Sequence, residues 1–200
     1  MDEPLNPQER QILLRIAREA VAHAAAGKTL PKLKLSSLPQ RLQQHGAAFV
    51  TLTINDRLRG CIGALQASQP LALDVQEHAA AAASQDYRFP PVTPQEVGQL
   101  EIEISRLSPS RELDYANADD LLAKLRPSVD GVVLRRGLQR ATFLPQVWEK
   151  IPDPADFLTQ LCYKMGAPGN LWQREHLQVL TYQVEEFKER GHPFTPYERE

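Results

Sequence analysis

The stretch from Leu100 to Ser105 alternates strictly between apolar and polar residues, which is the clearest β-strand pattern in the chain. A second run, from Phe49 to Ile54, is rich in β-branched residues, and the turn pair Asn55-Asp56 sends the chain back over 57–62 as a hairpin. Three more segments have strand patterns: 132–134, 140–143 and 177–184. Helical segments separate these strands irregularly, unlike the strand–helix repeat of a parallel sheet. The sequence therefore predicts an α+β fold with mostly antiparallel sheets and flanking helices.

The expected helices are marked by caps at their starts and by glycine or proline at their ends. Asn6 caps the first helix, Glu9 completes a capping box, and Gly27 ends the helical run. Similar signals indicate a short helix up to His45 and Gly46, a helix opened by Pro70, a helical turn opened by the capping box Thr93–Glu96, a helix from Asn117 to Leu125, and a helix from Asp153 to Gly166.

The length of 200 residues fits one domain over 1–200 built from two intimately packed lobes, and no linker marks a boundary between them. Residues 188–200 are expected to be a polar tail. The acidic start is unlike a signal peptide, and the apolar stretches are shorter than the roughly 20 residues that span a bilayer. Two cysteines outside any C-x-x-C pair are typical of reduced thiols, so a cytoplasmic protein is expected.

The segment from Leu58 to Gly63 is the strongest candidate for chemistry. It places Cys61 between Gly60 and Gly63, two positions after Arg59. A nearby cation favours thiolate over thiol, so Cys61 is a candidate nucleophile or redox group. The alternative is structural, because free cysteine is often a small core residue and the glycines can simply shape a turn.

Other polar groups have the same two interpretations. Asp86 and Arg88 either grip a polar ligand or pair and brace their loop, and Glu103 is either a solvated side chain or a general base beside a cleft. His78 is a possible base for Cys61, although a solvent-facing position is favoured. Cys162 lies within the apolar stripe of its helix and is expected in the core.

Several classes of site are disfavoured. The two glycines of the motif do not have the spacing of a phosphate-binding loop. The five histidines and two cysteines show no paired ligand spacing, so no metal site is expected. Residues 28–59 are locally basic but carry few aromatic residues, and the whole chain has a net charge of −2, so nucleic-acid binding is disfavoured.

Six segments together resemble the AMME chromosomal region candidate protein family, whose bacterial members are called AmmeMemoRadiSam system protein A. They occur in the family's order between residues 7 and 190: Phe49–Leu52, Leu58–Gly63, Asp86–Pro90, Leu100–Ser108, Leu144–Val147 and Phe157–Gly166. The resemblance implies two unequal lobes around a cleft. It brings no established activity and no known cofactor. The family's motif positions correspond here to Arg59, Gly60, Cys61, Gly63, Asp86, Arg88, Phe89 and Glu103.

Two functions are therefore expected in competition. In the first, the protein is a thiol-dependent enzyme or carrier, with Cys61 and Glu103 as catalytic candidates and with Arg59, Gly60, Gly63, Asp86 and Arg88 around the ligand. In the second, it is a non-catalytic adaptor that binds a small anion or a partner peptide through Arg59 and Arg88. The name of the bacterial system implies a Memo-like protein and a radical S-adenosylmethionine enzyme as partners.

Overall fold

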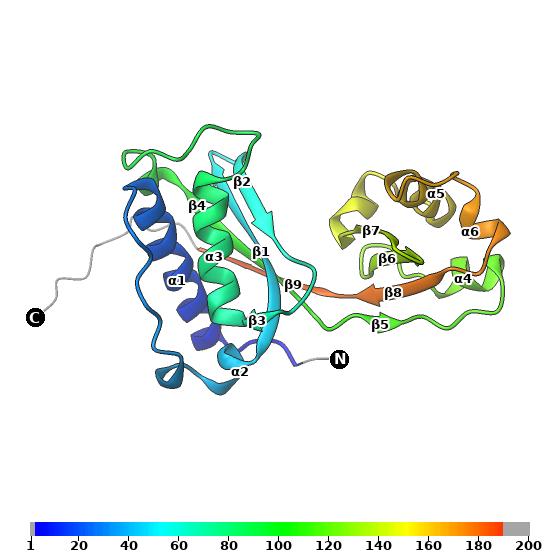
Figure 1. Cartoon of the computed structure of the whole chain (residues 1–200), viewed down its shortest axis with the longest axis horizontal. Helices are drawn as coiled ribbons and strands as arrows, with labels where there is room; N and C mark the ends of the chain where they lie inside the picture. The colour runs from blue at the N-terminus through cyan, green and yellow to red at the C-terminus, as the bar shows by residue number, and fades with distance from the viewer. Residues whose placement is uncertain (1–2, 190–200) are drawn as a thin grey trace, which may run out of the picture. The chain divides into compact units, whose positions relative to one another are not determined.

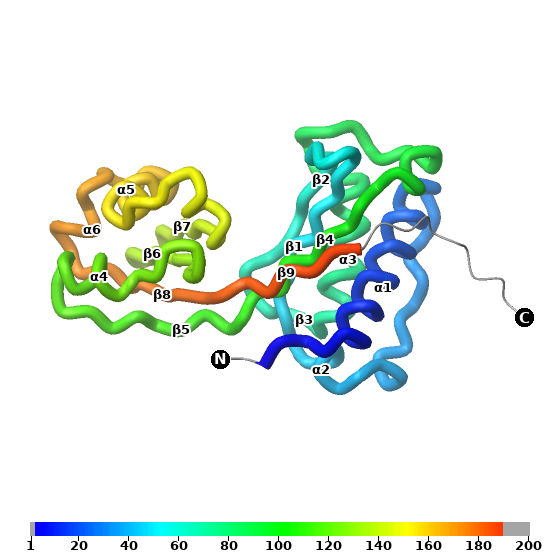
Figure 2. Tube along the Cα trace, turned by 180° about the vertical axis from the view of Figure 1, so that it is seen from behind, coloured from blue at the N-terminus to red at the C-terminus, as the bar shows by residue number. Residues whose placement is uncertain are grey.

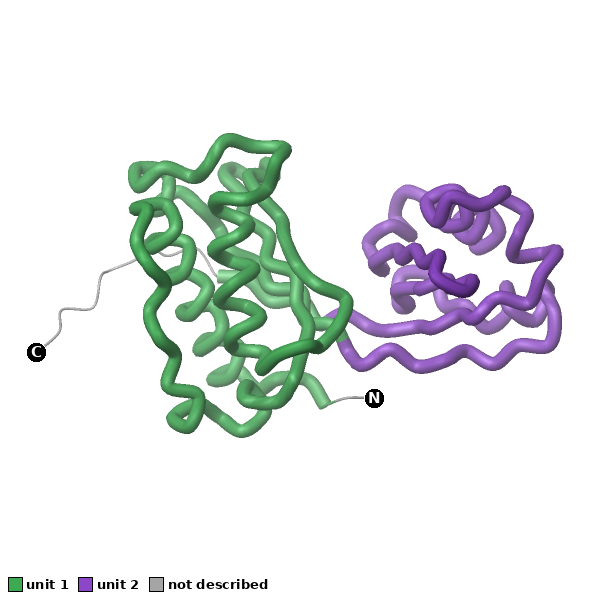
Figure 3. Tube along the Cα trace, in the orientation of Figure 1, with its two compact units in different colours: residues 1–107, 185–200 green, residues 108–184 purple. Residues whose placement is uncertain are grey.

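The computed structural model describes residues 3–189, which divide into two compact units (Figures 1 and 3). Residues 3–107 and 185–189 belong to the first unit, and residues 108–184 form the second. Each unit has its own sheet of mainly antiparallel strands, its own helices and its own apolar core. The α+β prediction is confirmed. The chain leaves the first unit once and returns to it, which no composition change in the sequence reveals.

The first unit is a sheet of strand order β2-β1-β4-β9 with helices on one face. Figures 1 and 2 show α1 and α3 side by side on that face. The elements are α1 (Pro7–Ala25), α2 (Gln40–Gln43), β1 (His45–Ile54), β2 (Arg57–Gly63), β3 (Gln69–Pro70), α3 (Leu71–Ser84), β4 (Glu101–Leu107) and β9 (Val184–Lys188), with 3-10 turns at Leu35–Ser37 and Val97–Gln99. Strand β3 pairs with the start of β1 and lies off the main order.

Local sequence explains the ends of these elements. Asn55 and Asp56 have φ values of 51° and 60°, so β1 and β2 are joined by the type I′ turn that Asx residues favour. At α1, the Asn6 side chain accepts the Glu9 N–H at 2.9 Å while the Glu9 carboxylate accepts the Asn6 N–H at 2.8 Å. The predicted hairpin turn and capping box are both confirmed.

The second unit is a four-stranded sheet of order β5-β8-β6-β7. Its core is centred on Trp148, whose ring stacks on Phe157 with centroids 3.6 Å apart and whose Nε1 donates to the Asp130 carbonyl at 2.7 Å. The elements are β5 (Arg111–Glu112), α4 (Ala118–Lys124), β6 (Gly131–Arg136), β7 (Gln139–Phe143), a 3-10 turn at Pro145–Glu149, α5 (Pro154–Lys164), α6 (Leu171–Arg174) and β8 (Gln178–Tyr182).

Three predictions about elements need correction. The expected final strand 177–184 is two strands, β8 in the second sheet and β9 in the first. The short helix ends at Gln43, so His45 and Gly46 already belong to β1. The expected polar tail 188–200 begins too early, because Lys188 lies in β9 and the Glu189 carboxylate pairs with Arg18. Residues 190–200 lie outside the described residues.

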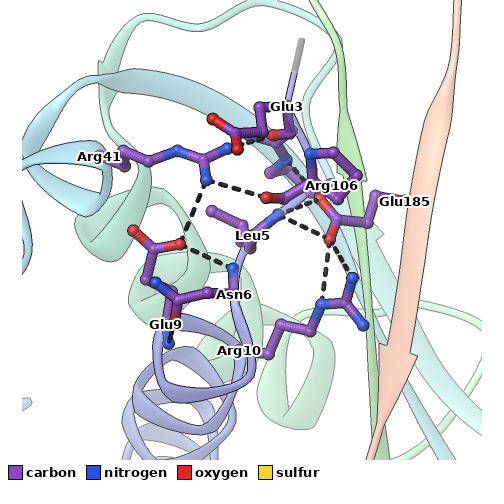
Figure 4. A network of polar contacts seen from close by, with 9 residues as sticks. Glu3, Leu5, Asn6, Glu9, Arg10, Arg41, Arg106 and Glu185 are labelled. Atoms are coloured by element: carbon purple, nitrogen blue, oxygen red, sulfur yellow. Dashed lines mark hydrogen bonds and ion pairs between the residues drawn. The ribbon is translucent and has the colours of Figure 1, made fainter. Parts of the chain in front are cut away.

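Strand β9 is fastened to the first unit by the polar network in Figure 4. The Glu185 carboxylate accepts the Leu5 N–H at 2.9 Å and pairs with Arg10 at 2.9 Å and Arg106 at 3.0 Å. Phe187, two residues along, is buried in the core of the unit. The returning strand is therefore an integral part of the first unit. Within residues 3–189, no helix combines the length and the apolar character needed to cross a bilayer.

Candidate functional site

The strand pattern places Cys61 on the face of the first sheet turned away from α1 and α3, which we call the distal face. A Cβ added to Gly60 would lie 2.2 Å from the Ala82 carbonyl oxygen, so Gly60 faces α3. Successive strand residues point to opposite faces, and Cys61 therefore points the other way. The same reasoning puts Thr51 and Glu103 on the distal face, because their strand neighbours, Val50, Leu52, Ile102 and Ile104, are buried in the core under the helices.

Cys61, Thr51 and Glu103 form one row across three strands. Thr51 is the register partner of Cys61 on β2 and of Glu103 on β4. The Thr51 hydroxyl donates to the Cys61 sulfur at 3.3 Å. Cys61 is half-buried, whereas Cys162 is fully buried as expected. A thiol, a hydroxyl and a carboxylate thus lie side by side, and the hydroxyl is already bonded to the sulfur.

The environment of Glu103 suits a proton acceptor. Burial raises the pKa of its carboxyl, the nearby Glu186 carboxylate raises it further, and Lys188 opposes the shift. A carboxylate with a raised pKa accepts protons more effectively than an ordinary one. Glu101, two residues earlier on the same face, instead pairs with Lys188 at 2.8 Å. Of the two strand glutamates that share this face, Glu103 has the environment of an acid–base group.

Asp86 and Arg88 hold the backbone of Cys61. Strand β2 lies at the edge of the sheet. There the Asp86 carboxylate accepts the Cys61 N–H at 2.8 Å, and Arg88 Nη2 donates to the Cys61 carbonyl at 3.3 Å. The two side chains pair with each other at 2.6 Å. They take the place of a neighbouring strand, so the exposed edge is capped at Cys61.

Hydrogen bonds favour the ionised form of both Asp86 and Arg88. The Arg88 guanidinium holds the pKa of Asp86 far below its usual range, against the opposing effect of burial, and the Cys61 N–H lowers it further. The Asp86 carboxylate in turn raises the pKa of Arg88, and the Cys61 thiol adds to that effect. The guanidinium of Arg88 therefore lies within electrostatic reach of the sulfur.

Arg59 is bonded to the loop that follows α3. The Arg59 Nε donates to Glu96 at 2.9 Å and its Nη1 donates to the Pro90 carbonyl at 2.8 Å. The Arg59 guanidinium is therefore bonded to the loop 86–96. Arg59, followed by the Thr93 N–H, lowers the pKa of Glu96 to about 2. Sequence reasoning gave Glu96 no site role, although the Thr93-x-x-Glu96 spacing was the signal for it. Only half of that capping box forms, with Glu96 accepting the Thr93 N–H at 2.8 Å.

Packing accounts for the two glycines and for His78. A Cβ on Gly63 would lie 2.5 Å from the Phe49 Cα, so neither motif glycine leaves room for a side chain. His78 Nδ1 lies 3.1 Å from the carboxylate of the buried Asp74, on the helix that covers the opposite face from Cys61. His78 is neither a base for Cys61 nor a freely solvated residue. Within residues 3–189, no three His, Cys, Asp or Glu side chains gather where a metal ion would need them.

The comparisons with known proteins each find matches that cover most of this chain. The model of the AMMECR1 family matches residues 14–187. A protein of Methanothermobacter thermautotrophicus is 35% identical over 94% of this chain and 98% of its own, and one of Methanopyrus kandleri is 34% identical over 94% and 92%. The crystal structure of an uncharacterised protein from Pyrococcus horikoshii superposes with a TM-score of 0.81 at 30% identity and covers 98% of both chains.

Proposed function

The chain belongs to the AMMECR1 family, and on that premise we propose that its distal face is a thiol site at which Cys61 accepts a group from an electrophilic substrate. The observation that carries the proposal is the hydrogen bond from the Thr51 hydroxyl to the Cys61 sulfur. A donor at this distance stabilises the thiolate, which is the nucleophilic form of cysteine. The half-buried thiol and the absence of a disulfide leave the sulfur available for chemistry.

The reaction is a nucleophilic displacement at carbon. The Cys61 thiol gives up its proton, its sulfur forms a bond to the electrophilic carbon, and the bond to the leaving group breaks with its electron pair. Neighbouring strands lie about 4.8 Å apart, so Glu103 is two strands, or roughly 10 Å of backbone spacing, from Cys61. Thr51 lies between them in register, so in this proposal its hydroxyl accepts the thiol proton while it releases its own proton toward Glu103. The hydroxyl then donates to the thiolate, in the direction of the hydrogen bond seen in the structure.

The remaining motif residues position the site. Asp86 and Arg88 fix the Cys61 backbone, Arg59 fastens the loop that carries them, and Gly60 and Gly63 permit close packing. Among residues 3–189, Nη1 of Arg88 has no hydrogen-bond partner, and its side chain is 44% exposed. We assign this nitrogen to an anionic group of the substrate.

The test is the rate at which iodoacetamide alkylates Cys61 at neutral pH. Replacing Glu103 by Gln should slow alkylation at least about tenfold, since general bases contribute about 100-fold or more to proton transfer. Glu101→Gln is the matched control, because Glu101 shares the strand face but pairs with Lys188. Equal rates in wild type and Glu103→Gln would refute the role of Glu103.

A second candidate function is that of a protein-binding adaptor. It is favoured by Tyr87, which is 95% exposed on the loop braced by Asp86 and Arg88. Exposed aromatic side chains on rigid supports commonly anchor protein interfaces. Its partners would be the Memo-like protein and the radical S-adenosylmethionine enzyme that the family resemblance implies. The free thiols of both cysteines support a cytoplasmic location for either function.

The adaptor function predicts that Tyr87→Ala weakens binding to a purified Memo-like protein or radical enzyme from the same organism at least tenfold. Tyr163→Ala is the control, because Tyr163 is also an exposed tyrosine, at 58%, and lies on α5 of the second unit. Titration calorimetry would measure both variants. Equal affinities for the two variants would count against docking through Tyr87.

A further inference from the structure

Two arginines face each other on neighbouring strands of the second sheet. Arg135 on β6 is the register partner of Arg140 on β7. Val132, Leu134 and Ala141 belong to the apolar core, so strand alternation puts both arginines on the face turned away from that core. Like charges directly opposite one another in a sheet are destabilising. The fold therefore places two like charges opposite one another on this face.

No carboxylate neutralises this pair. Among residues 3–189, neither Arg135 nor Arg140 makes an ion pair or a side-chain hydrogen bond, and the Arg135 Nε is buried without an acceptor. The next residue behaves differently, since Arg136 pairs with Glu175 at 2.8 Å. On its other side Arg135 faces Gln178, whose amide donates to Glu112 at 3.3 Å. Two guanidinium groups are left without an anionic partner.

A third cation lies beside the same edge strand. Lys164 Nζ donates to the Thr142 carbonyl at 3.0 Å and lies 5.0 Å from the centre of the Phe143 ring. Thr142 is two residues along β7 from Arg140, and the described residues include no carboxylate partner for Lys164 either. Lys164 is thus a further cation beside β7, on the side of the sheet where Phe143 packs against the core.

We propose that Arg135 and Arg140 form a binding site for the phosphate group of a small phosphate monoester. The planar fork of arginine matches phosphate oxygens, and a dianion would neutralise both side chains at once. The adjoining row on the same face carries Val133, which is buried, and Leu180, which is half-buried and offers apolar surface for the rest of the ligand. The site lies in the second unit and is independent of the thiol chemistry proposed for Cys61.

The experiment is thermal unfolding of the full-length protein in phosphate-free buffer, with phenyl phosphate added at constant ionic strength. The Tm of the wild type should rise with ligand concentration, as expected when a ligand binds only the folded state. Arg140→Gln and Arg135→Gln should each weaken the apparent affinity about tenfold or more, because each removes a charge-assisted hydrogen-bonding group. Arg136→Gln is the matched control and should retain the wild-type response.

A second readout separates binding from a role in folding. Without ligand, Arg140→Gln should leave the Tm unchanged or raise it, since it relieves repulsion. Inorganic phosphate acting as strongly as phenyl phosphate would assign the site to the phosphate group alone and still support it. Two results would overturn the proposal. The first is an equal rise in Tm with phenyl phosphate in Arg136→Gln and Arg140→Gln. The second is a rise in Tm only with a DNA oligonucleotide, whose log affinity falls linearly with log salt concentration.

Discussion

At the scale of single residues, the motif around Cys61 is shaped by contact with α3. Gly60 and Ala82 meet so closely that any side chain at position 60 would strike helix backbone. Backbone cannot move aside as a flexible side chain can, so the contact fixes which face of β2 meets the helix. It thereby fixes the face on which Cys61 lies.

We predict that Gly60→Ala destabilises the protein by about 1–3 kcal/mol or more, the usual cost of overpacking. The added Cβ would lie 2.2 Å from the Ala82 carbonyl oxygen. Urea unfolding at neutral pH measures the change. Gly98→Ala is the control and should be nearly neutral, because a Cβ there meets nothing within 4 Å. A Gly60→Ala variant as stable as Gly98→Ala would contradict this contact.

The sequence allowed Cys61, Glu103 and the Asp86–Arg88 pair to be singled out, but it did not predict how they are arranged. Thr51 and Glu96 were not assigned to the site, since a threonine in a strand carries no distinctive pattern and the Thr93–Glu96 spacing indicates only the start of a helical turn. Their roles arise from strand register and from a contact 37 positions apart in the chain. The sequence also did not predict that the Arg59 side chain reaches Glu96 and the Pro90 carbonyl, and its ligand-binding role stays a prediction.

At the scale of elements, the loop 86–96 is held to β2 by the Arg59–Glu96 ion pair and by the hydrogen bonds of Asp86 and Arg88 to the Cys61 backbone. Both carboxylates have pKa values lowered by their arginine partners. A group with a lowered pKa in the folded state stabilises the fold above its unfolded pKa, and this contribution is lost as pH falls toward the folded value.

For Glu96 the pH window follows from its pKa of about 2 in the folded protein, against about 4.3 when unfolded. We predict that Glu96→Gln costs about 1–2 kcal/mol at neutral pH and progressively less as pH falls from about 5 toward 2. Urea unfolding of both proteins across this range measures the difference. Glu19→Gln on the exposed face of α1 is the control for removing a surface carboxylate. A difference independent of pH would mean that the ion pair does not hold the loop.

Element prediction failed where a periodic pattern continued across a boundary. The stretch 177–184 alternates without interruption, so nothing local shows that β8 ends at Tyr182 and that β9 joins another sheet. The turn at Asn55-Asp56 and the cap at Asn6 were predictable because their chemistry is local. Partner choice between sheets depends on tertiary contacts, which alternation does not encode.

At the scale of the whole molecule, the second unit is a continuous segment inserted into a discontinuous first unit. Ser108 and Gln183, near the two ends of the insertion, are joined by two hydrogen bonds. The Ser108 N–H donates to the Gln183 carbonyl at 2.8 Å, and the Gln183 N–H donates to the Ser108 hydroxyl at 2.9 Å. Segments whose ends lie together and which have their own core often fold alone. The first unit, by contrast, depends on β9, which supplies the buried Phe187 and the Glu185 carboxylate.

We predict that residues 108–184 fold cooperatively as a separate fragment, whereas residues 1–107 alone do not. Joining 1–108 to 183–200 through a short Gly-Ser linker should restore folding of the first unit, because β9 is then present. Circular dichroism with urea titration would compare the three proteins. A stable, cooperative 1–107 fragment would show that β9 is dispensable.

The central claim, that Cys61 is a nucleophile supported by Thr51, is tested most directly by mass-spectrometric measurement of carboxymethylation in the native protein at neutral pH. Cys162 serves as the internal reference, since burial raises the pKa of its thiol. Wild-type Cys61 should react while Cys162 stays unmodified. Thr51→Val should slow Cys61 about fivefold or more, as expected for a lost hydrogen bond of about 1 kcal/mol, and Thr51→Ser should restore the rate. A Cys61 as inert as Cys162, or unaffected by Thr51→Val, would contradict the claim.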